Sequence, residues 1–405
     1  MRSTVFLGLM LAMSGVTMAK GPHPAMSGIM AAADDASVAG TNPAGMTRFD
    51  ERVMRAEVQA FLPDNTWEGQ LGNGTTFRLK EDDSTVIPSG KMVMPFKGNY
   101  WFGFTILGSG FSEDFGEDWP GRYFVQDYDL LYISAFPSIA TKINDQWSVA
   151  ASLAMTYTSY EQNKAVVNFD DPANDGKLNI DTDGFTTGFA LSALYEMNDR
   201  TRFGFSYRSE LDPELDGDAN FSDLSPTTEA ILDAAGLLGA NVDVTSRTPQ
   251  SILAGLYHEF DDTSSVTFDT VWADFSEFKL SEIYVNDNQV TQSDIDYEDI
   301  WAFSVGYNRP LTERTRIGFG FMYVDDMVDD DERSMTLRLD SLWSAGVGIE
   351  WQWTDRRVVT VNLNYVKLDD APITSPPLGS LGTVTGEYVD RETIWLNAAL
   401  SFGTR

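Results

Sequence analysis

Few side chains in this chain have the types and spacing that enzymatic chemistry requires. The sequence has no cysteine and only two histidines, His23 and His258, and neither lies at a recognisable catalytic spacing from a nucleophile and an acid. Without cysteine, disulfides and thiolate-based zinc or iron–sulfur sites are excluded. The sequence therefore predicts that the protein is not an enzyme and holds no cofactor or metal.

Two acidic runs, residues 170–176 and 325–332, offer the oxygen ligands that Ca²⁺ prefers. Neither run has the residue spacing of an EF-hand loop. Solvated loops are the simpler interpretation of both runs, and binding of divalent cations is the alternative.

The composition limits the classes of protein that remain. The 405 residues include 61 Asp and Glu against 28 Lys and Arg, which gives a net charge of −33. Such a charge repels phosphate, so nucleic-acid binding is not expected. Hydrophobic residues make up 42% of the chain and aromatic residues 12%, which supplies ample surface to bury and argues against disorder.

The first nineteen residues have the features of a signal peptide. Arg2 supplies a positive charge, residues 5–13 form an apolar run too short to span a bilayer, and small residues at 17 and 19 suit a signal peptidase. A buried N-terminal helix is the alternative. No later window holds about 18 consecutive apolar residues, which leaves a soluble periplasmic protein or an outer-membrane barrel.

The remainder of the chain alternates with a period of two. In residues 359–365, apolar side chains occupy the odd positions and polar side chains the even ones. Residues 317–323 place large apolar groups on one face and mostly glycine on the other, and residues 203–208 repeat this pattern. A period of two predicts β-strands, each with one apolar face and one small, polar face.

Strand length and aromatic position favour a membrane barrel over a soluble sandwich. The predicted strands often reach about 12 residues, whereas soluble strands average about five or six. Tyr and Trp gather near predicted strand ends, for example at 100–102 and 351–353, as they do at membrane interfaces. In such a barrel the apolar face contacts lipid and the small, polar face lines the interior.

Counting the strands gives the architecture. We predict fourteen strands, at residues 51–62, 85–97, 99–111, 125–143, 146–161, 177–198, 201–216, 241–260, 264–286, 294–309, 312–327, 336–353, 357–369 and 385–402. Short connections tend to alternate with long ones, the latter at 63–84, 112–124, 162–176, 217–240 and 370–384. The fold class is therefore all-β, a 14-stranded antiparallel transmembrane β-barrel in the outer membrane of a Gram-negative bacterium. We expect a monomer that contacts outer-membrane lipid and lipopolysaccharide.

One long connection also predicts a helix. Ser225 provides an N-cap, Pro226 suits the first helical position, and Gly239 can end the helix. Ile231 and Leu238 then share an apolar side. This side either packs against neighbouring loops or captures an apolar ligand outside the cell.

The segment at 20–50 is not strand-like and contains two short motifs. Asp34-Asp35-Ala36 is followed closely by Asn42-Pro43-Ala44, and a strand at 203–211 (FGFSYRSEL) comes later. In these motifs and in its layout the chain resembles the FadL family of outer-membrane transporters for long-chain fatty acids and other hydrophobic compounds. The resemblance implies three parts: a signal peptide at 1–19, an N-terminal hatch at 20–50 and a barrel with extracellular loops at 51–405.

The resemblance also implies a route. A hydrophobic ligand is captured outside, enters a pocket beside the hatch, and leaves through a gap in the wall where the third strand kinks. Gly103, Gly108 and Gly110 in the predicted third strand permit such a kink, or they merely face a crowded interior. The Asn42-Pro43-Ala44 turn is the candidate gating element of the hatch, with an ordinary turn before the first strand as the alternative.

The residues that could contact a ligand are basic ones for a carboxylate head group and apolar ones for an alkyl chain. A buried carboxylate head group needs a cationic partner, for which Arg48, Arg55, Arg208 and Lys367 are candidates. Met26, Ile29 and Met30 in the hatch are the apolar candidates, because flexible methionine adapts to varied chains. Salt bridges inside the barrel and packing of the hatch against the wall are the respective alternatives.

The sequence also departs from the family pattern. The segment before Asp34 is short, the connection at 162–176 lacks the expected helices, and three residues follow Phe402. The prediction is passive outer-membrane transport of hydrophobic molecules, most simply long-chain fatty acids. A general diffusion porin or a purely structural barrel is the alternative, and an adhesin is a weaker one.

Overall fold

The computed structural model describes residues 22–81, 84–171, 173–285, 288–291, 296–329, 333, 340–374 and 383–403. The predicted signal peptide at 1–19 lies outside this part of the chain. Within it, no helix is both long and apolar enough to cross a membrane.

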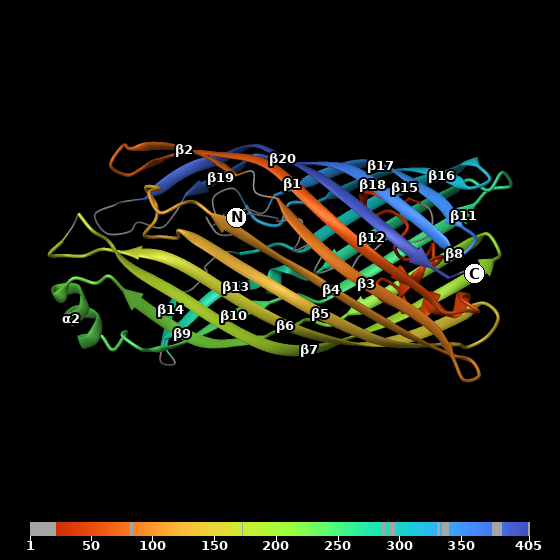
Figure 1. The fold of residues 1–405 in the computed structure, drawn as a ribbon, viewed down its shortest axis with the longest axis horizontal. Coiled ribbons are helices and arrows are strands. Elements are labelled where there is room, and N and C mark those ends of the chain that lie inside the picture. The colour runs from red at the N-terminus through yellow and green to blue at the C-terminus, as the bar shows by residue number, and fades with distance from the viewer. Residues whose placement is uncertain are drawn as a thin grey trace.

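Most described residues belong to one closed antiparallel sheet (Figure 1). Its strands are β1 (Val53–Leu71), β2 (Thr76–Glu81), β3 (Thr85–Phe96), β4 (Tyr100–Asp114), β5 (Asp127–Lys142), β6 (Trp147–Val166), β7 (Gly176–Asn198), β8 (Thr201–Arg208), β9 (Glu214–Ser222), β10 (Asn241–Arg247), β11 (Ser251–Glu259), β12 (Ser265–Ala273), β13 (Lys279–Val285), β14 (Asn288–Thr291), β15 (Ile300–Thr312), β16 (Thr315–Val324), β17 (Leu342–Thr354), β18 (Arg357–Leu368), β19 (Ala371–Thr374) and β20 (Val384–Phe402). β20 pairs with β1 and so closes the ring.

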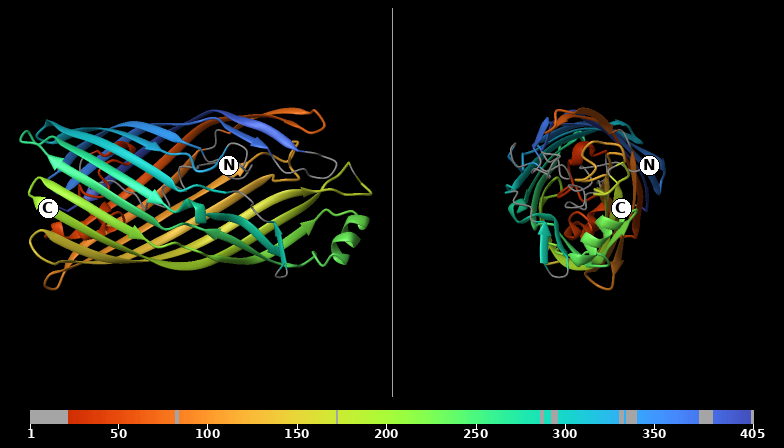
Figure 2. Two further views of the ribbon diagram at one scale, coloured as in Figure 1. Left: turned by 180° about the vertical axis from the view of Figure 1, so that it is seen from behind. Right: turned by 90° about the vertical axis from the view of Figure 1, so that its left-hand side faces the viewer.

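Six pairs of consecutive strands each continue one another along the barrel wall. β8 and β9, for example, both pair with β7, and β2 and β3 both pair with β1. Counted in this way the wall has fourteen strands, which confirms the predicted 14-stranded antiparallel barrel. The strands cross the long axis obliquely, as closure of a barrel requires (Figures 1 and 2).

The two faces of each strand differ as the sequence predicted. On β15, Trp301, Phe303 and Val305 are exposed on the outside, whereas Ser304 and Asn308 are buried inside. Lipid solvates the outer apolar side chains, and every strand has a neighbour for its backbone hydrogen bonds. On β15 the inward positions named here therefore carry small or polar side chains.

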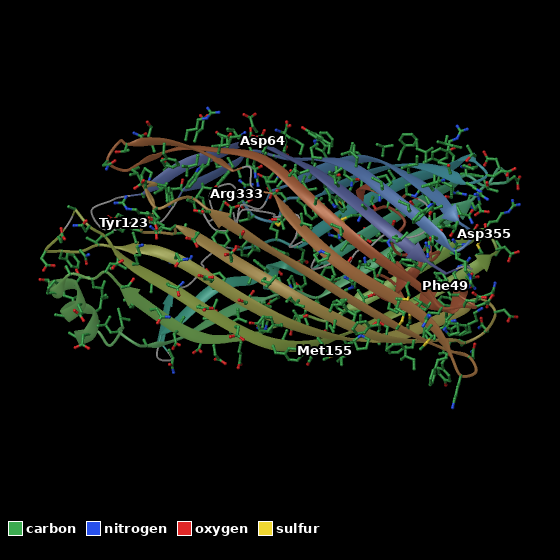
Figure 3. The ribbon with its side chains drawn as sticks, viewed as in Figure 1. Phe49, Asp64, Tyr123, Met155, Arg333 and Asp355 are labelled. Carbon is green, nitrogen blue, oxygen red and sulfur yellow. The ribbon has the colours of Figure 1, made fainter. Side chains whose placement is uncertain are left out.

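The two ends of the barrel differ. Short turns such as 143–146 and 199–200 lie at the end where β20 finishes, and long hairpins lie at the other end with α2 (Pro226–Ala234) (Figures 1 and 2). Figure 3 shows Phe49 and Asp355 near the short-turn end and Tyr123 near the long-hairpin end. By the general pattern of bacterial barrels, the long hairpins are the extracellular end.

Two local predictions at this outer end were wrong. In the described part of the predicted connection at 63–84, residues 63–81 do not form a loop, because β1 continues to Leu71 and pairs with β2 in a tall hairpin. The helix α2 begins after Ser225 as predicted but ends at Ala234, and Gly236 takes a left-handed φ of 69°. Leu238 therefore lies beyond the helix that was predicted to carry it.

Glycines on the inner wall make room for the N-terminal segment, residues 22–50, which lies within the ring of strands (Figure 2). A methyl group added at Gly320 would overlap the carbonyl oxygen of Pro24, and one at Gly204 would overlap that of Met30. These positions are glycine because the backbone of the segment approaches the backbone of the wall. We call residues 22–50 the plug.

This fit yields a first prediction. We expect Gly320→Val to push the start of the plug off the wall without unfolding the barrel, because no side chain fits beneath Pro24. In limited proteolysis of the purified protein in detergent, the plug of Gly320→Val should be cleaved at least about tenfold faster than the plug of Gly90→Val. Gly90 is the matched control, since a methyl group there meets only Ile106, at 3.6 Å. Equal cleavage of the two variants would contradict the fit.

Candidate functional site

The plug is built from three short 3₁₀ turns rather than from strands. They are η1 (Pro24–Met26), η2 (Ala36–Ala39) and η3 (Pro43–Arg48). Proline begins η1 and η3, where its missing N–H costs nothing. The Asp35 side chain caps η2 by accepting a hydrogen bond from the Ser37 backbone at 2.7 Å. Nearly all plug residues are buried.

The first part of the plug is held by wall side chains that bind its backbone. The Asp269 carboxylate on β12 accepts hydrogen bonds from the N–H groups of Gly28 (2.5 Å) and Met30 (3.0 Å). The Arg202 guanidinium on β8 donates to the carbonyl oxygens of Ala31 (2.9 Å) and Ala32 (2.7 Å). The wall thus satisfies backbone groups that would otherwise be buried without partners.

The predicted gating residues lie where the second part of the plug meets β7. The Asn42 amide donates to the carbonyl oxygens of Met30 (2.8 Å) and Ala193 (3.1 Å), so it joins both halves of the plug to the wall. Pro43 follows as the first residue of η3, and the Ala44 N–H donates to the Ser192 hydroxyl at 3.1 Å.

A buried network of charges joins the plug to β1 and β3. Arg55 donates to the Asp35 carboxylate of the plug at 2.6 Å and to Glu57 at 3.0 Å. Glu57 also accepts from Lys91 (2.9 Å) and from the Asn397 amide (2.6 Å). Arg55, Glu57 and Lys91 are each less than 5% exposed. Such a network is stable only when every charge has its partner.

The basic residues predicted to meet a ligand head group therefore all contact protein groups. Arg55 pairs with Asp35, and Arg48 pairs with Glu196 and donates to the Ala33 carbonyl oxygen. Arg208 donates to the carbonyl oxygen of Gly40 at 3.0 Å. Lys367, on β18, lies 3.6 Å from Glu392 across the sheet. Three of the four thus join the plug to the wall.

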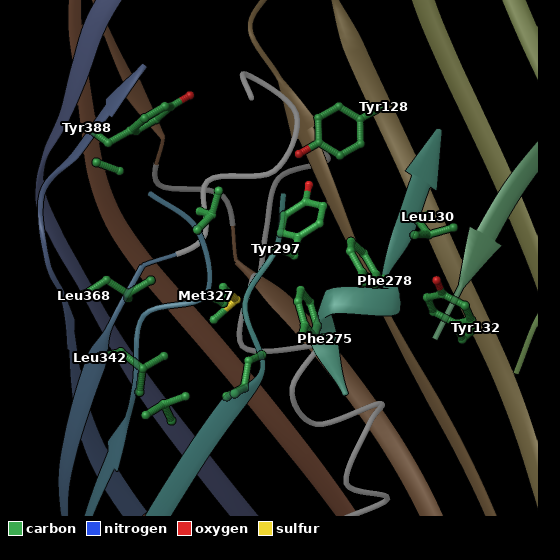
Figure 4. Close-up of a cluster of buried hydrophobic side chains, with 14 of the residues drawn as sticks. Tyr128, Leu130, Tyr132, Phe275, Phe278, Tyr297, Met327, Leu342, Leu368 and Tyr388 are labelled. Atoms are coloured by element: carbon green, nitrogen blue, oxygen red, sulfur yellow. The ribbon is translucent and has the colours of Figure 1, made fainter. Parts of the chain in front are cut away.

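The predicted apolar contacts lie in a different setting. Met26, Ile29 and Met30 are buried and belong to one apolar cluster that continues along the inside of the barrel toward its outer end. Figure 4 shows its outer members pointing inward from several strands and loops. They include Leu130, Tyr132, Phe275, Phe278, Tyr297, Met327, Leu342, Leu368 and Tyr388. The interior is therefore mixed around the plug, where polar contacts lie beside a second apolar cluster that includes Val38, Met46 and Phe49, and it is mainly apolar above the plug.

An aromatic group covers part of this apolar region at the outer end. Trp67 on β1 packs against Phe77, Phe115, Trp119 and Tyr388, with ring centroids 4.8–5.8 Å apart. Pairs of this kind add about 0.5–1.5 kcal/mol each to burial of the rings. Trp67 thus covers this part of the interior, whereas the exposed side chains of Arg78 and Lys80 show that β2 extends into solvent.

The wall opens between β3 and β4. Their pairing runs from Phe96 and Tyr100 as far as Ser89 and Leu107, and among the described residues it stops there. Residues 85–88 remain paired with β1 on one side, and residues 108–114 remain paired with β5 on the other. We call the space between these two segments the wall gap.

The wall gap contains a cavity of about 420 Å³. It is lined by Thr85, Val86, Ile87, Pro88, Gly108, Ser109, Gly110, Ser112, Asp129, Leu130, Leu131, Ser159 and Glu161. Proline cannot donate a ladder hydrogen bond, which suits Pro88 to this edge. Gly110 has a φ of 155°, and an added methyl group would overlap the Leu130 carbonyl oxygen. An L-residue at this position would therefore strain the edge of the gap.

The three glycines predicted in the kinked strand have two different environments. Gly108 and Gly110 line the wall gap. Gly103 lies in the fully paired part of β4, where an added methyl group would overlap the Met46 sulfur of the plug. At the outer end, Ile231 on α2 is 49% exposed and Leu238 is half-buried.

Comparison with known proteins identifies this arrangement. A family model described as "Outer membrane protein transport protein (OMPP1/FadL/TodX)" matches residues 8–395. The chain belongs to the FadL/TodX family. It is therefore an outer-membrane β-barrel that transports hydrophobic compounds, and the family is not enzymatic.

Individual relatives of the FadL/TodX protein are distant. The "Long-chain fatty acid transport protein" of Escherichia coli O6:H1 is 23% identical over 377 residues, covering 84% of this chain and 83% of the relative. "Outer membrane protein P1" of Haemophilus influenzae is 22% identical over 395 residues, covering 85% of this chain and 83% of the relative.

Solved structures share the fold. A Pseudomonas aeruginosa FadL homologue superimposes with a TM-score of 0.86 at 19% identity, covering 96% of this chain and 99% of the homologue. The Pseudomonas putida toluene transporter TodX superimposes with a TM-score of 0.65 at 13% identity, covering 93% and 98%.

Several residues that hold the plug in this FadL/TodX barrel were not predicted from the sequence. Asp269, Arg202 and Glu57 are charged residues at inward positions of alternating strands, and that position was the available signal. The alternation shows that such a side chain faces the interior but does not identify its partner, which comes from a strand or turn far away in sequence.

The charge network yields a second prediction. Glu57→Gln leaves Arg55 and Lys91 without their shared carboxylate, and removing one partner of a buried ion pair costs about 3–5 kcal/mol. We expect a loss of this size in the free energy of unfolding, measured by urea titration in detergent. Glu68→Gln on the same strand is the control. Its partner Arg78 is solvent-exposed, so the loss should stay below about 1 kcal/mol. Equal losses would contradict the role of Glu57.

Proposed function

We propose that this protein carries long-chain fatty acids or similar apolar molecules from the outside into the outer membrane through the wall gap. The observation that carries the proposal is the combination of an apolar interior, a plug beneath it and an opening in the wall beside it. One relative is named for long-chain fatty acid transport and one solved structure for toluene transport. Both names support an apolar substrate for this chain.

Capture depends on the apolar lining above the plug. Each buried methylene of a ligand contributes about 0.8 kcal/mol, so a long alkyl chain gains enough to leave water for this region. Met26 and Met30, with Ile29, form the floor of the apolar cluster. Methionine adapts its shape to chains of different length, which suits a transporter with broad specificity.

Release is sideways rather than downward. The plug fills the barrel at its short-turn end and is bound there by backbone and charge contacts, so a straight aqueous path would require its displacement. The wall gap offers an exit between Val86 and Leu131, whose side chains are exposed to lipid. In this scheme, a shift of the plug around Asn42 moves the ligand from the apolar region above the plug to the wall gap.

A general diffusion porin is the alternative function. It would need a hydrated pore along the axis, and the buried plug argues against one. Steady ion conduction by the unmodified protein in a planar bilayer would favour the porin.

Blocking the wall gap tests the exit route. We expect Gly108→Trp to reduce uptake of radiolabelled oleate by cells at least about tenfold, because the indole fills the space through which the chain leaves. Gly90→Trp is the matched control, since Gly90 lies on the outward face of β3 where the strand is fully paired with β4. Normal uptake in Gly108→Trp would exclude the gap as the exit.

The plug is tested separately. We expect replacement of Asn42-Pro43-Ala44 by three glycines to raise oleate uptake about threefold or more, because loss of the two Asn42 hydrogen bonds, worth about 1 kcal/mol each, loosens the plug. The same replacement at residues 73–75, in the turn between β1 and β2, is the control. Heat-modifiable migration on gels verifies the folded barrel in both variants. Unchanged uptake would count against a gating plug.

A further inference from the structure

The wall gap has an inner polar group that the transport scheme does not use. Ser109 lines the cavity and is 5% exposed, and its hydroxyl has no hydrogen-bond partner among the described residues. A buried hydroxyl without a partner costs about 1–3 kcal/mol, so it is a site where a ligand group can bind. A hydroxyl both donates and accepts, and so it suits an uncharged polar head group.

The outer rim of the same gap carries negative charge. Asp129 on β5 and Glu161 on β6 are direct cross-strand neighbours, and both line the cavity. None of the described lining residues is basic. Glu161 accepts a hydrogen bond from the Asn179 amide at 3.2 Å, which orients its carboxylate.

The carboxylates lie at the upper edge of the lipid-facing surface. On β5 the next outward residues after Asp129 are Leu131 and Ile133, each 45% exposed. A molecule that leaves the interior through the gap therefore passes Asp129 and Glu161 as it enters lipid. A ligand carboxylate at this point meets like charges in a region of reduced dielectric constant, where repulsion is stronger than in water.

The cations that bind the plug do not line the gap. Arg55, Arg48 and Arg208 contact the plug or its acidic neighbours, at the other end of the route. An anionic head group at the rim therefore meets the two carboxylates and none of these three cations. An alcohol or a protonated acid meets no such barrier, and its hydroxyl can donate to either carboxylate.

We propose that the wall gap selects by charge: it passes uncharged amphiphiles, including the protonated form of a fatty acid, and excludes carboxylate anions. Ser109 binds the uncharged head group at the inner side, and Asp129 with Glu161 repels the anion at the rim. This inference rests on the proposed function, in which the gap is the exit.

The test compares two probes with the same alkyl chain. Uptake of radiolabelled oleate and of oleyl alcohol is measured in cells that express the full chain or carry an empty vector. In D129N/E161Q, which removes two charges, we expect oleate uptake to rise at least about fivefold, the factor that corresponds to repulsion by a single unit charge about 4 Å away in water. Uptake of oleyl alcohol should change less than about twofold, because it carries no charge.

The matched control is D216N/D243N. Asp216 on β9 and Asp243 on β10 are also cross-strand neighbours on the outer face and carry the same charge, but they do not line the gap. In this variant, uptake of both probes should stay unchanged. An equal rise of oleate uptake in the control would overturn the proposal, because a general change of surface charge would then explain it.

The remaining outcomes separate this inference from the function beneath it. Unchanged oleate uptake in D129N/E161Q, with oleyl alcohol still entering above the empty vector, would overturn the charge selection and leave transport intact. An equal rise in the uptake of both probes would indicate a wider gap and would also overturn the charge selection. If uptake of both probes is no higher than in cells with the empty vector, the proposed function is wrong, and the charge selection is wrong with it.

Discussion

One buried carboxylate, Glu57, determines how the plug can be held inside this barrel. It binds Arg55, Lys91 and Asn397 from three strands, and Arg55 in turn binds Asp35 of the plug. None of these charges can be removed from its partners without a large desolvation cost, so the plug and the wall form one polar unit. A plug that moves during transport must therefore exchange these contacts for others, or pivot on them, rather than simply leave.

The interior has two regions with different side-chain contacts. Around the plug, backbone groups and charges bind each other, and glycines such as Gly320 and Gly204 allow close approach. Above it, apolar and aromatic side chains line the space beneath the outer hairpins. The wall gap adjoins the apolar region, where the interruption of pairing between β3 and β4 exposes backbone groups at an edge.

Much of the fold was predictable because lipid imposes a simple pattern. Alternation of Trp301, Phe303 and Val305 with smaller or polar residues fixed the strands and their outward face, and the number of strands followed. The site was predictable only in part. The sequence singled out Asn42, Arg55 and the glycines of the third strand, but it did not separate Gly103, which lies against the plug, from Gly108 and Gly110, which line the gap. It also offered Arg48, Arg55 and Arg208 as ligand partners, whereas the structure has them bound to protein groups.

By itself, then, the sequence determined a barrel with lipid outside, an unusual segment before the first strand and a family resemblance, because each depends on local order along the chain. Only the tertiary structure decided which inward charges meet, how far β1 and β2 extend as a hairpin, and where the wall opens. These features depend on contacts between residues far apart in sequence, such as Glu57 with Asn397 or Gly28 with Asp269, and on the register between strands. A one-dimensional pattern contains neither, because the same alternation is compatible with many registers and many pairings of inward side chains.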